Sequence, residues 1–140
     1  MRVVLDTNIL VSALRSSKGA SHAILGSLPN SKFKTVLSVP LYFEYISVLK
    51  RPGLLPEEIL PSDIDAVCQY FTRISHLQEI FYLWRPVLSD PKDDMVLELA
   101  VASGADYIVT QNLSDFKPAT MFGIHSVRPG EFINQIGGLT

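Results

Sequence analysis

The chain has 140 residues, of which 47% are hydrophobic and 19% are charged, and its formal net charge is −2. This length suits one domain with its own core, over residues 1–140, and the composition excludes a disordered chain. The small negative charge excludes a protein that holds nucleic acid by bulk electrostatics alone, but it does not exclude a nuclease whose acids bind a cation.

No part of the sequence approaches the roughly 20 consecutive apolar residues needed to span a bilayer. The N-terminus lacks the basic, then apolar, then small-residue layout of a signal peptide. The single cysteine, Cys68, excludes an intramolecular disulfide, and its place in an apolar helical stripe predicts a core position. We therefore expect a cytoplasmic protein that does not contact a membrane.

Strand and helix patterns alternate along the chain. In chain order, the predicted elements are a strand at 2–5, helices at 8–14 and 20–28, a strand at 34–38, helices at 40–50 and 62–75, a strand within 77–88, a helix from 93 or 94 to 103, strands at 107–110 and 123–127, and a helix from 129. Pro40 suits the first residue of its helix, and Gly104 suits a C-terminal cap. The alternation predicts a three-layer α/β/α domain with a central, mainly parallel sheet.

The first candidate site residue is Asp6, which directly follows the apolar run Val3-Val4-Leu5. A buried strand that ends in a carboxylate places charge at the sheet edge where α/β folds keep their sites. One such acid is ambiguous by itself. Its role depends on whether later acids are delivered to the same edge.

The predicted helix at 40–50 carries a second unusual acid, Glu44. It is the only acid in a nearly apolar segment, and it shares a helical face with Leu41 and Val48. A lone solvated residue on an exposed strip is the alternative interpretation.

The start of the helix near residue 93 carries two adjacent acids, Asp93 and Asp94. An acid in the first turn is stabilised by the helix dipole, so one of the two is explained as a cap. Asp94 is in line with the apolar Leu97 and Val101, which makes it the better candidate for a site. Glu98, four residues later, is a weaker candidate to replace or assist it.

The predicted strand at 107–110 is also followed by polar groups. Asn112 and Asp115 are both candidates to complete a site at this strand end. Asp115 is an equally good cap for a short helix.

Carboxylates that gather at one edge need a cation. Two like charges about 4 Å apart repel by roughly 4 kcal/mol at an effective dielectric constant of 20. Hard oxygen ligands without paired His or Cys favour Mg²⁺ or Mn²⁺ over Zn²⁺. Three histidines lie far apart and without zinc-ligand spacing, and we interpret them as surface or locally hydrogen-bonded residues: His22, His76 and His125.

With these residues in order, the chain resembles the PIN-domain family of ribonucleases, which includes many prokaryotic toxins of toxin–antitoxin pairs. Val4-Leu5-Asp6-Thr7-Asn8 resembles the first acidic motif of the family, and Glu44 matches the second acid. The segment from Asp93 to Ala100 resembles the third motif, with Asp94 the better match to its acid. The segment from Ala105 to Phe116 resembles the fourth, except that Asn112 stands where an acid is usual.

The resemblance implies hydrolysis of phosphodiester bonds in single-stranded RNA by a metal-dependent endoribonuclease. Asp6, Glu44 and Asp94 would hold one Mg²⁺ or Mn²⁺, and either Asp115 or Asn112 would complete the site. It also implies a cognate antitoxin as partner and a homodimer. Two neighbours would orient the carboxylates, Asn8 and Thr110. Four basic residues near these segments are either contacts to RNA phosphates or, more simply, solvated surface charges: Arg15, Lys18, Lys50 and Arg51.

Two other classes remain as alternatives. A non-catalytic PIN-like module that binds RNA or a protein is favoured by the neutral Asn112. A phosphatase with Asp6 as nucleophile would carry a second acid two residues later, where this chain has Asn8. A nucleotide-binding Rossmann domain lacks support because no Gly-x-Gly-x-x-Gly follows the first strand.

Overall fold

The computed structural model of the chain describes residues 1–80 and 90–140. In chain order its elements are β1 (Arg2–Leu5), α1 (Thr7–Arg15), α2 (Ala20–Gly26), β2 (Lys34–Leu37), α3 (Val39–Leu49), α4 (Pro61–Ile74), β3 (His76–Leu77), α5 (Pro91–Ser103), β4 (Tyr107–Val109), the 3₁₀ segment η1 (Leu113–Phe122), β5 (His125–Val127) and α6 (Pro129–Gln135). The order of strands and helices agrees with the sequence prediction, to which the structure adds η1.

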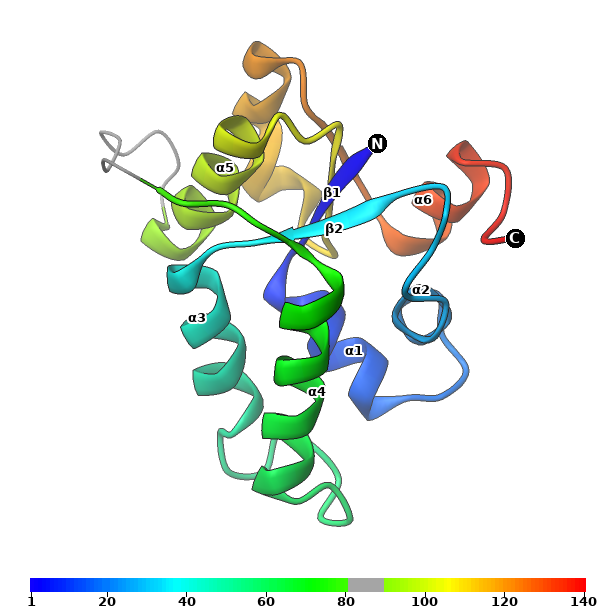
Figure 1. Cartoon of the computed structure of the whole chain (residues 1–140), viewed down its shortest axis with the longest axis vertical. Helices are drawn as coiled ribbons and strands as arrows, with labels where there is room; N and C mark the ends of the chain where they lie inside the picture. Colours follow the sequence, from blue (N-terminus) through cyan, green and yellow to red (C-terminus); the bar gives the residue numbers. More distant parts are fainter. Residues whose placement is uncertain (81–89) are drawn as a thin grey trace.

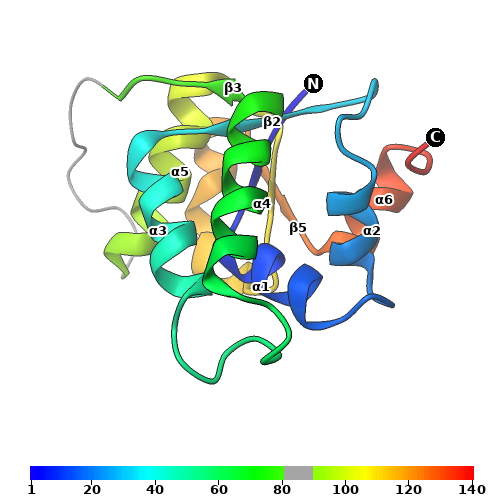
Figure 2. The same cartoon turned by 60° about the horizontal axis from the view of Figure 1, so that its bottom comes forward.

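In the described part of the chain, five strands form one parallel sheet in the order β3-β2-β1-β4-β5. β1 is the central strand, paired with β2 on one side and β4 on the other. Figures 1 and 2 show the sheet between α5 on one face and α2 with α6 on the other. The predicted three-layer α/β/α architecture is confirmed.

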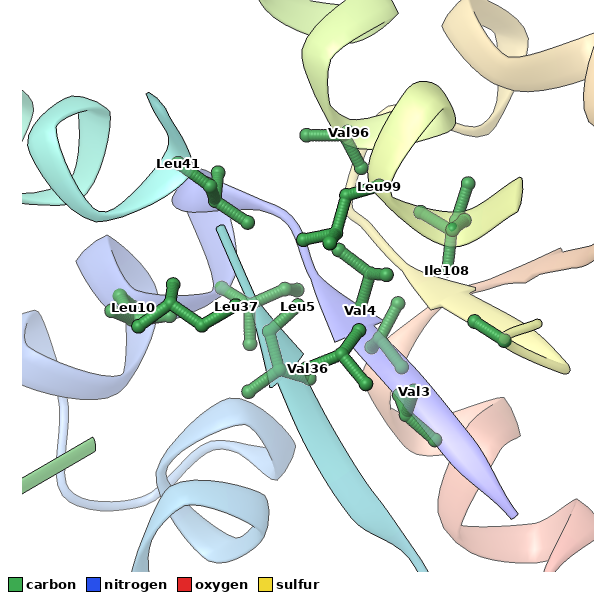
Figure 3. Close-up of a cluster of buried hydrophobic side chains, with 14 of the residues drawn as sticks. Val3, Val4, Leu5, Leu10, Val36, Leu37, Leu41, Val96, Leu99 and Ile108 are labelled. Atoms are coloured by element: carbon green, nitrogen blue, oxygen red, sulfur yellow. The ribbon is translucent and has the colours of Figure 1, made fainter. Parts of the chain in front are cut away.

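The central strand is buried on both faces. Val3, Val4 and Leu5 have no exposed surface, as expected for a strand covered by helices on both sides. In Figure 3, Leu99 of α5 lies against Val4. Full burial of one such side chain stabilises the fold by about 1.5–3 kcal/mol. This packing fixes β1, and therefore fixes the point at which the next residue, Asp6, leaves the sheet.

The start of α5 differs from the prediction. The helix begins at Pro91, not at Asp93 or Asp94, and Asp90 is its N-cap residue. The Asp90 side chain accepts a hydrogen bond from the Lys92 N–H at 2.9 Å. An Asp cap followed by Pro at the first helical position is a strong start signal, and it sets the helix boundary here. Both later acids therefore lie inside the first turn. At the other end, Gly104 adopts the left-handed conformation of the predicted C-terminal cap, with φ of 68°.

One edge of the sheet is formed by β3. For the strand predicted within 77–88, the structure shows β3 at His76–Leu77, paired with Val36 and Leu37 of β2. Residues 81–89 lie outside the described part of the chain.

Cys68 is buried in α4, as predicted. None of the helices within 1–80 and 90–140 combines the length and apolar character required to cross a membrane.

Candidate active site

Asp6 lies at the carboxyl end of the central strand. Its main-chain N–H donates to the carbonyl of Val109 at 2.9 Å, which continues the pairing of β1 with β4 by one residue. Asp6 is also the N-cap residue of α1. The side chain is only 8% exposed, so the fold holds an aspartate almost buried at the edge of its sheet.

Three hydrogen bonds hold the Asp6 carboxylate. The Thr7 N–H donates to Oδ1 at 2.8 Å, as in an ordinary helix cap. The Thr110 hydroxyl donates to Oδ2 at 2.7 Å, and the Asn8 side-chain amide donates to the same oxygen at 3.2 Å. Donors of this kind favour the charged carboxylate and fix its direction. Asn8 and Thr110 are the two residues that the sequence predicted to orient carboxylates.

Asn8 and Thr110 are themselves held in place. The Asn8 side-chain carbonyl accepts the Gln111 N–H at 3.2 Å, which fixes the orientation of the amide group. The Thr110 hydroxyl accepts the Asn112 N–H at 3.0 Å. The chain that follows β4 is therefore built around the two groups that contact Asp6.

Glu44 enters the site from α3. Its neighbour Tyr45 is fully buried, and the Tyr45 hydroxyl donates a hydrogen bond to the carbonyl of Leu5, directly before Asp6. This contact ties α3 to the end of β1. The Glu44 side chain is 15% exposed, and the Lys92 ammonium lies 3.6 Å from its Oε1. Lys92 is half exposed, so this long ion pair stabilises the fold by less than about 1 kcal/mol.

The acids act on one another electrostatically. Burial raises the pKa of Asp6; the Thr110 and Thr7 hydrogen bonds oppose this rise, and the charges of Asp115 and Glu44 add to it. The pKa of Asp93 is raised to about 7, first by burial and then by the charges of Asp6, Asp115 and other neighbouring aspartates. Four acids from four segments therefore interact at this edge: Asp6, Glu44, Asp93 and Asp115.

The structure brings Asp93 into this group, whereas the sequence favoured Asp94. Asp94 acts on the pKa of Asp93 and belongs to the same helical turn. Asp93 is in line with Val96 and Ala100, at i+3 and i+7, and both are fully buried; of the residues in line with Asp94, Val101 is only partly buried. The more deeply buried stripe is a sequence signal that favours Asp93, but only once the start of α5 is known.

The remaining candidates lie at the margin of this group. Asn112 is exposed, and its main-chain carbonyl accepts the Asp115 N–H at 3.1 Å. Glu98 is partly buried one turn further along α5. Lys50 forms an ion pair with Asp65 of α4 at 2.8 Å. The other basic candidates are exposed side chains: Arg15, Lys18 and Arg51.

The donor chemistry at this edge is that of Mg²⁺ or Mn²⁺. All four acids offer oxygen, and the histidines pair elsewhere, as His22 does with the Ala13 carbonyl at 3.0 Å. Within residues 1–80 and 90–140, no three His, Cys, Asp or Glu side chains are already grouped to hold an ion. Mg²⁺ ordinarily keeps several waters and is bound by one or two protein carboxylates. The acids fit a water-rich ion of that kind.

The sequence profile of the PIN domain matches residues 2–114 of the chain. The chain belongs to the PIN-domain family. The match takes in Asp6, Glu44, Asp93 and Asn112, and it ends one residue before Asp115. PIN domains are generally nucleases that use divalent metal ions.

A solved structure has the same fold as this PIN domain. It is VapBC2 from Rickettsia felis, crystallised with a DNA fragment from its promoter. The match has a TM-score of 0.61 at 17% identity and covers 91% of this chain and 98% of the other. A search of curated proteins finds no match.

Replacement of Thr110 by valine should destabilise this PIN domain mainly when Asp6 is charged. Thr110 is fully buried, and valine keeps its shape but cannot donate to the Asp6 carboxylate. A hydrogen bond to a charged group contributes about 1.5–3 kcal/mol. We expect a loss of that size in urea unfolding at about pH 8 and a smaller loss at about pH 3, below the ordinary aspartate pKa of about 3.9. Equal losses at both pH values would contradict this role.

Replacement of Asp93 by asparagine should stabilise the metal-free PIN domain at higher pH. The pKa of Asp93 rises from 3.8 to about 7 on folding, so the folded state binds more protons than the unfolded chain between these values. The contribution of Asp93 to stability therefore falls as the pH rises from about 4 to about 7. In EDTA, Asp93→Asn should have the same melting temperature as the parent protein near pH 4 and a higher melting temperature near pH 8. A melting difference that does not change with pH would contradict the raised pKa.

Proposed function

We propose that this PIN domain is a metal-dependent endoribonuclease that hydrolyses single-stranded RNA, and that it is the toxin of a toxin–antitoxin pair. The observation that supports this most is the group of acids at the carboxyl edge of the sheet, in which burial and mutual repulsion raise the pKa of Asp6 and Asp93. Carboxylates whose charges repel one another gain stability when a divalent cation joins them.

In this proposal, Asp6 is the central metal ligand because it is the acid most firmly held. Glu44 and Asp93 bind the same ion directly or through water, and Asp94 is the alternative to Asp93. Asp115 completes the site in preference to Asn112, because the charge of Asp115 acts on both Asp6 and Asp93. The bound ion would supply an activated water and neutralise charge on the phosphate.

Thr110 and Asn8 orient Asp6 in this reaction, as their hydrogen bonds to Oδ2 indicate. Lys92 balances Glu44 in the metal-free protein and moves away from it, or onto an RNA phosphate, when the ion binds. The Lys92 side chain is half exposed, so it can move without displacing buried side chains.

An antitoxin partner is supported by the fold shared with VapBC2. We propose that such a partner covers the acidic edge, and that the protein forms a homodimer and acts in the cytoplasm. At 17% identity, the shared fold supports an antitoxin partner without identifying it; the homodimer and the cytoplasmic location rest on the family resemblance.

Asp6→Asn should abolish RNA cleavage without unfolding the protein. The substitution removes the charge of the central ligand. Mutation of a group that only supports a metal ligand typically lowers metal affinity or activity by about 10–100-fold. With Mn²⁺ and a labelled single-stranded RNA, we expect a loss of more than about 100-fold, and EDTA should abolish cleavage by the parent protein. The control is Asp65→Asn, which removes an acid of α4 that pairs with Lys50.

Cleavage by the Asp6→Asn variant at the parent rate would contradict the ribonuclease assignment. Absence of both cleavage and Mn²⁺ binding in the parent protein would favour the non-catalytic PIN-like module.

Titration with Mn²⁺ should distinguish Asp93 from Asp94. Asp93→Asn should raise the dissociation constant for Mn²⁺ at least about tenfold, a change of 1.4 kcal/mol, because it removes a carboxylate that interacts with Asp6. Asp94→Asn is the matched control and should change it less than about threefold. The opposite ranking would assign the third ligand to Asp94.

A further inference from the structure

A hollow lies beside the acids at the same edge of the sheet. Its volume is about 460 Å³, within the range of small-molecule sites, and its walls come from α1, α2, the loop between them, the second residue after β4 and the start of α6. Its polar lining consists of three serine hydroxyls, one amide, one guanidinium and one carboxylate: Ser12, Ser16, Ser21, Gln111, Arg128 and Glu131. The proposed cleavage reaction assigns no role to Gln111, Arg128 or Glu131.

The hollow is joined to the acids through Asn8. The Gln111 N–H donates to the Asn8 side chain, and Asn8 donates to the Asp6 carboxylate, so one residue separates the two features. Asn8 and Ser12 are four residues apart on α1 and therefore share a helical face.

The ends of β4 and β5 bring Gln111 and Arg128 to neighbouring positions in the hollow. The Thr110 N–H donates to the Val127 carbonyl at 2.9 Å, which aligns the ends of β4 and β5. Gln111 and Arg128 are the next residues of these neighbouring segments. Both side chains are exposed, so a ligand can reach them from solvent.

The lining favours a neutral ring with hydrogen-bonding edges over a simple anion. Arg128 and Glu131 carry opposite charges, so together they give a phosphate little net attraction. The Gln111 amide offers both a donor and an acceptor, and the hydroxyls offer both as well. The Gln111 side-chain N–H donates to the Ser21 hydroxyl over 3.5 Å, a long contact that a ligand can replace. Gly19, Ala20 and Pro129 provide apolar surface for the face of a ring.

We propose that this hollow binds one nucleobase of single-stranded RNA, that of a nucleotide next to the cleaved phosphodiester. The proposal rests on the proposed function, because it assigns a substrate contact to the same edge. Unpaired bases are recognised through hydrogen bonds to their exposed edges, and a glutamine amide is suited to that pairing. Gln111 contacts the edge of the base through hydrogen bonds, and the protein therefore prefers particular bases near the cut.

The first test measures binding of mononucleotides without any cleavage. The four nucleoside 5′-monophosphates and inorganic phosphate are titrated into the parent protein in EDTA, and amide NMR shifts are followed. We expect at least one nucleotide to bind about threefold or more tightly than the others, with shifts at Gly19 and Gly130. Gln111→Ala should remove this difference, whereas the exposed Gln69→Ala on α4 should preserve it.

Three results would overturn the proposal. The first is absence of nucleotide binding, and the second is equal binding of all four bases. The third is binding of inorganic phosphate with the same shifts and affinity, which would identify an anion site instead. An unchanged preference in Gln111→Ala would also exclude the assigned role of Gln111.

The second test maps cleavage positions in a random-sequence RNA pool. The parent protein and Gln69→Ala should show a base preference within one or two nucleotides of the cut, and Gln111→Ala should flatten it while cleavage continues. Cleavage without any base preference would overturn the nucleobase site but leave the ribonuclease assignment standing. Absence of cleavage would overturn the ribonuclease assignment, and the binding titration would still decide the hollow.

Discussion

The hydrogen bonds to the Asp6 carboxylate are the constraint on which the rest of the site depends. Burial at the edge of the sheet disfavours the charge of Asp6, and the donors from Thr110, Thr7 and Asn8 counteract that penalty. The same contacts order the chain after β4 and cap α1. Because these hydrogen bonds fix the Asp6 carboxylate, it cannot turn away from the other acids. The repulsion between Asp6 and those acids is therefore relieved by protonation or by a cation.

The edge has two parts with different chemistry. One part holds Asp6 with acids from α3, α5 and η1, whose mutual repulsion suits a divalent ion. The other part is a hollow whose lining contains one cation, one acid and neutral hydrogen-bonding groups. In the proposed reaction, the first part would hold the phosphate that is cut, and the second would hold a neighbouring base. Asn8 contacts Asp6 in the first part and Gln111 in the second. The orientation of the Asp6 carboxylate and the position of Gln111 are therefore coupled.

The sequence predicted the fold and Asp6 because both depend on local patterns. Apolar runs of strand length alternate with helical stripes, and an acid that directly follows a buried strand can be placed without knowing the rest of the fold. The sequence pattern favours Asp94, and the structure makes Asp93 the stronger candidate because the choice depends on the start of α5, which the Asp90 cap and Pro91 set. The hollow was missed because Ser12, Gln111 and Arg128 come from distant segments, and only the order of the sheet brings them together.

The central claim is that Asp6 is the principal ligand of a divalent ion at this edge. Anomalous diffraction from a crystal of the parent protein soaked in Mn²⁺ tests it most directly. The account predicts one strong manganese peak in direct contact with an Asp6 oxygen, with Asp93 nearer to the ion than Asp94. A manganese peak remote from Asp6, or none at the edge under conditions where Mn²⁺ supports cleavage, would contradict it.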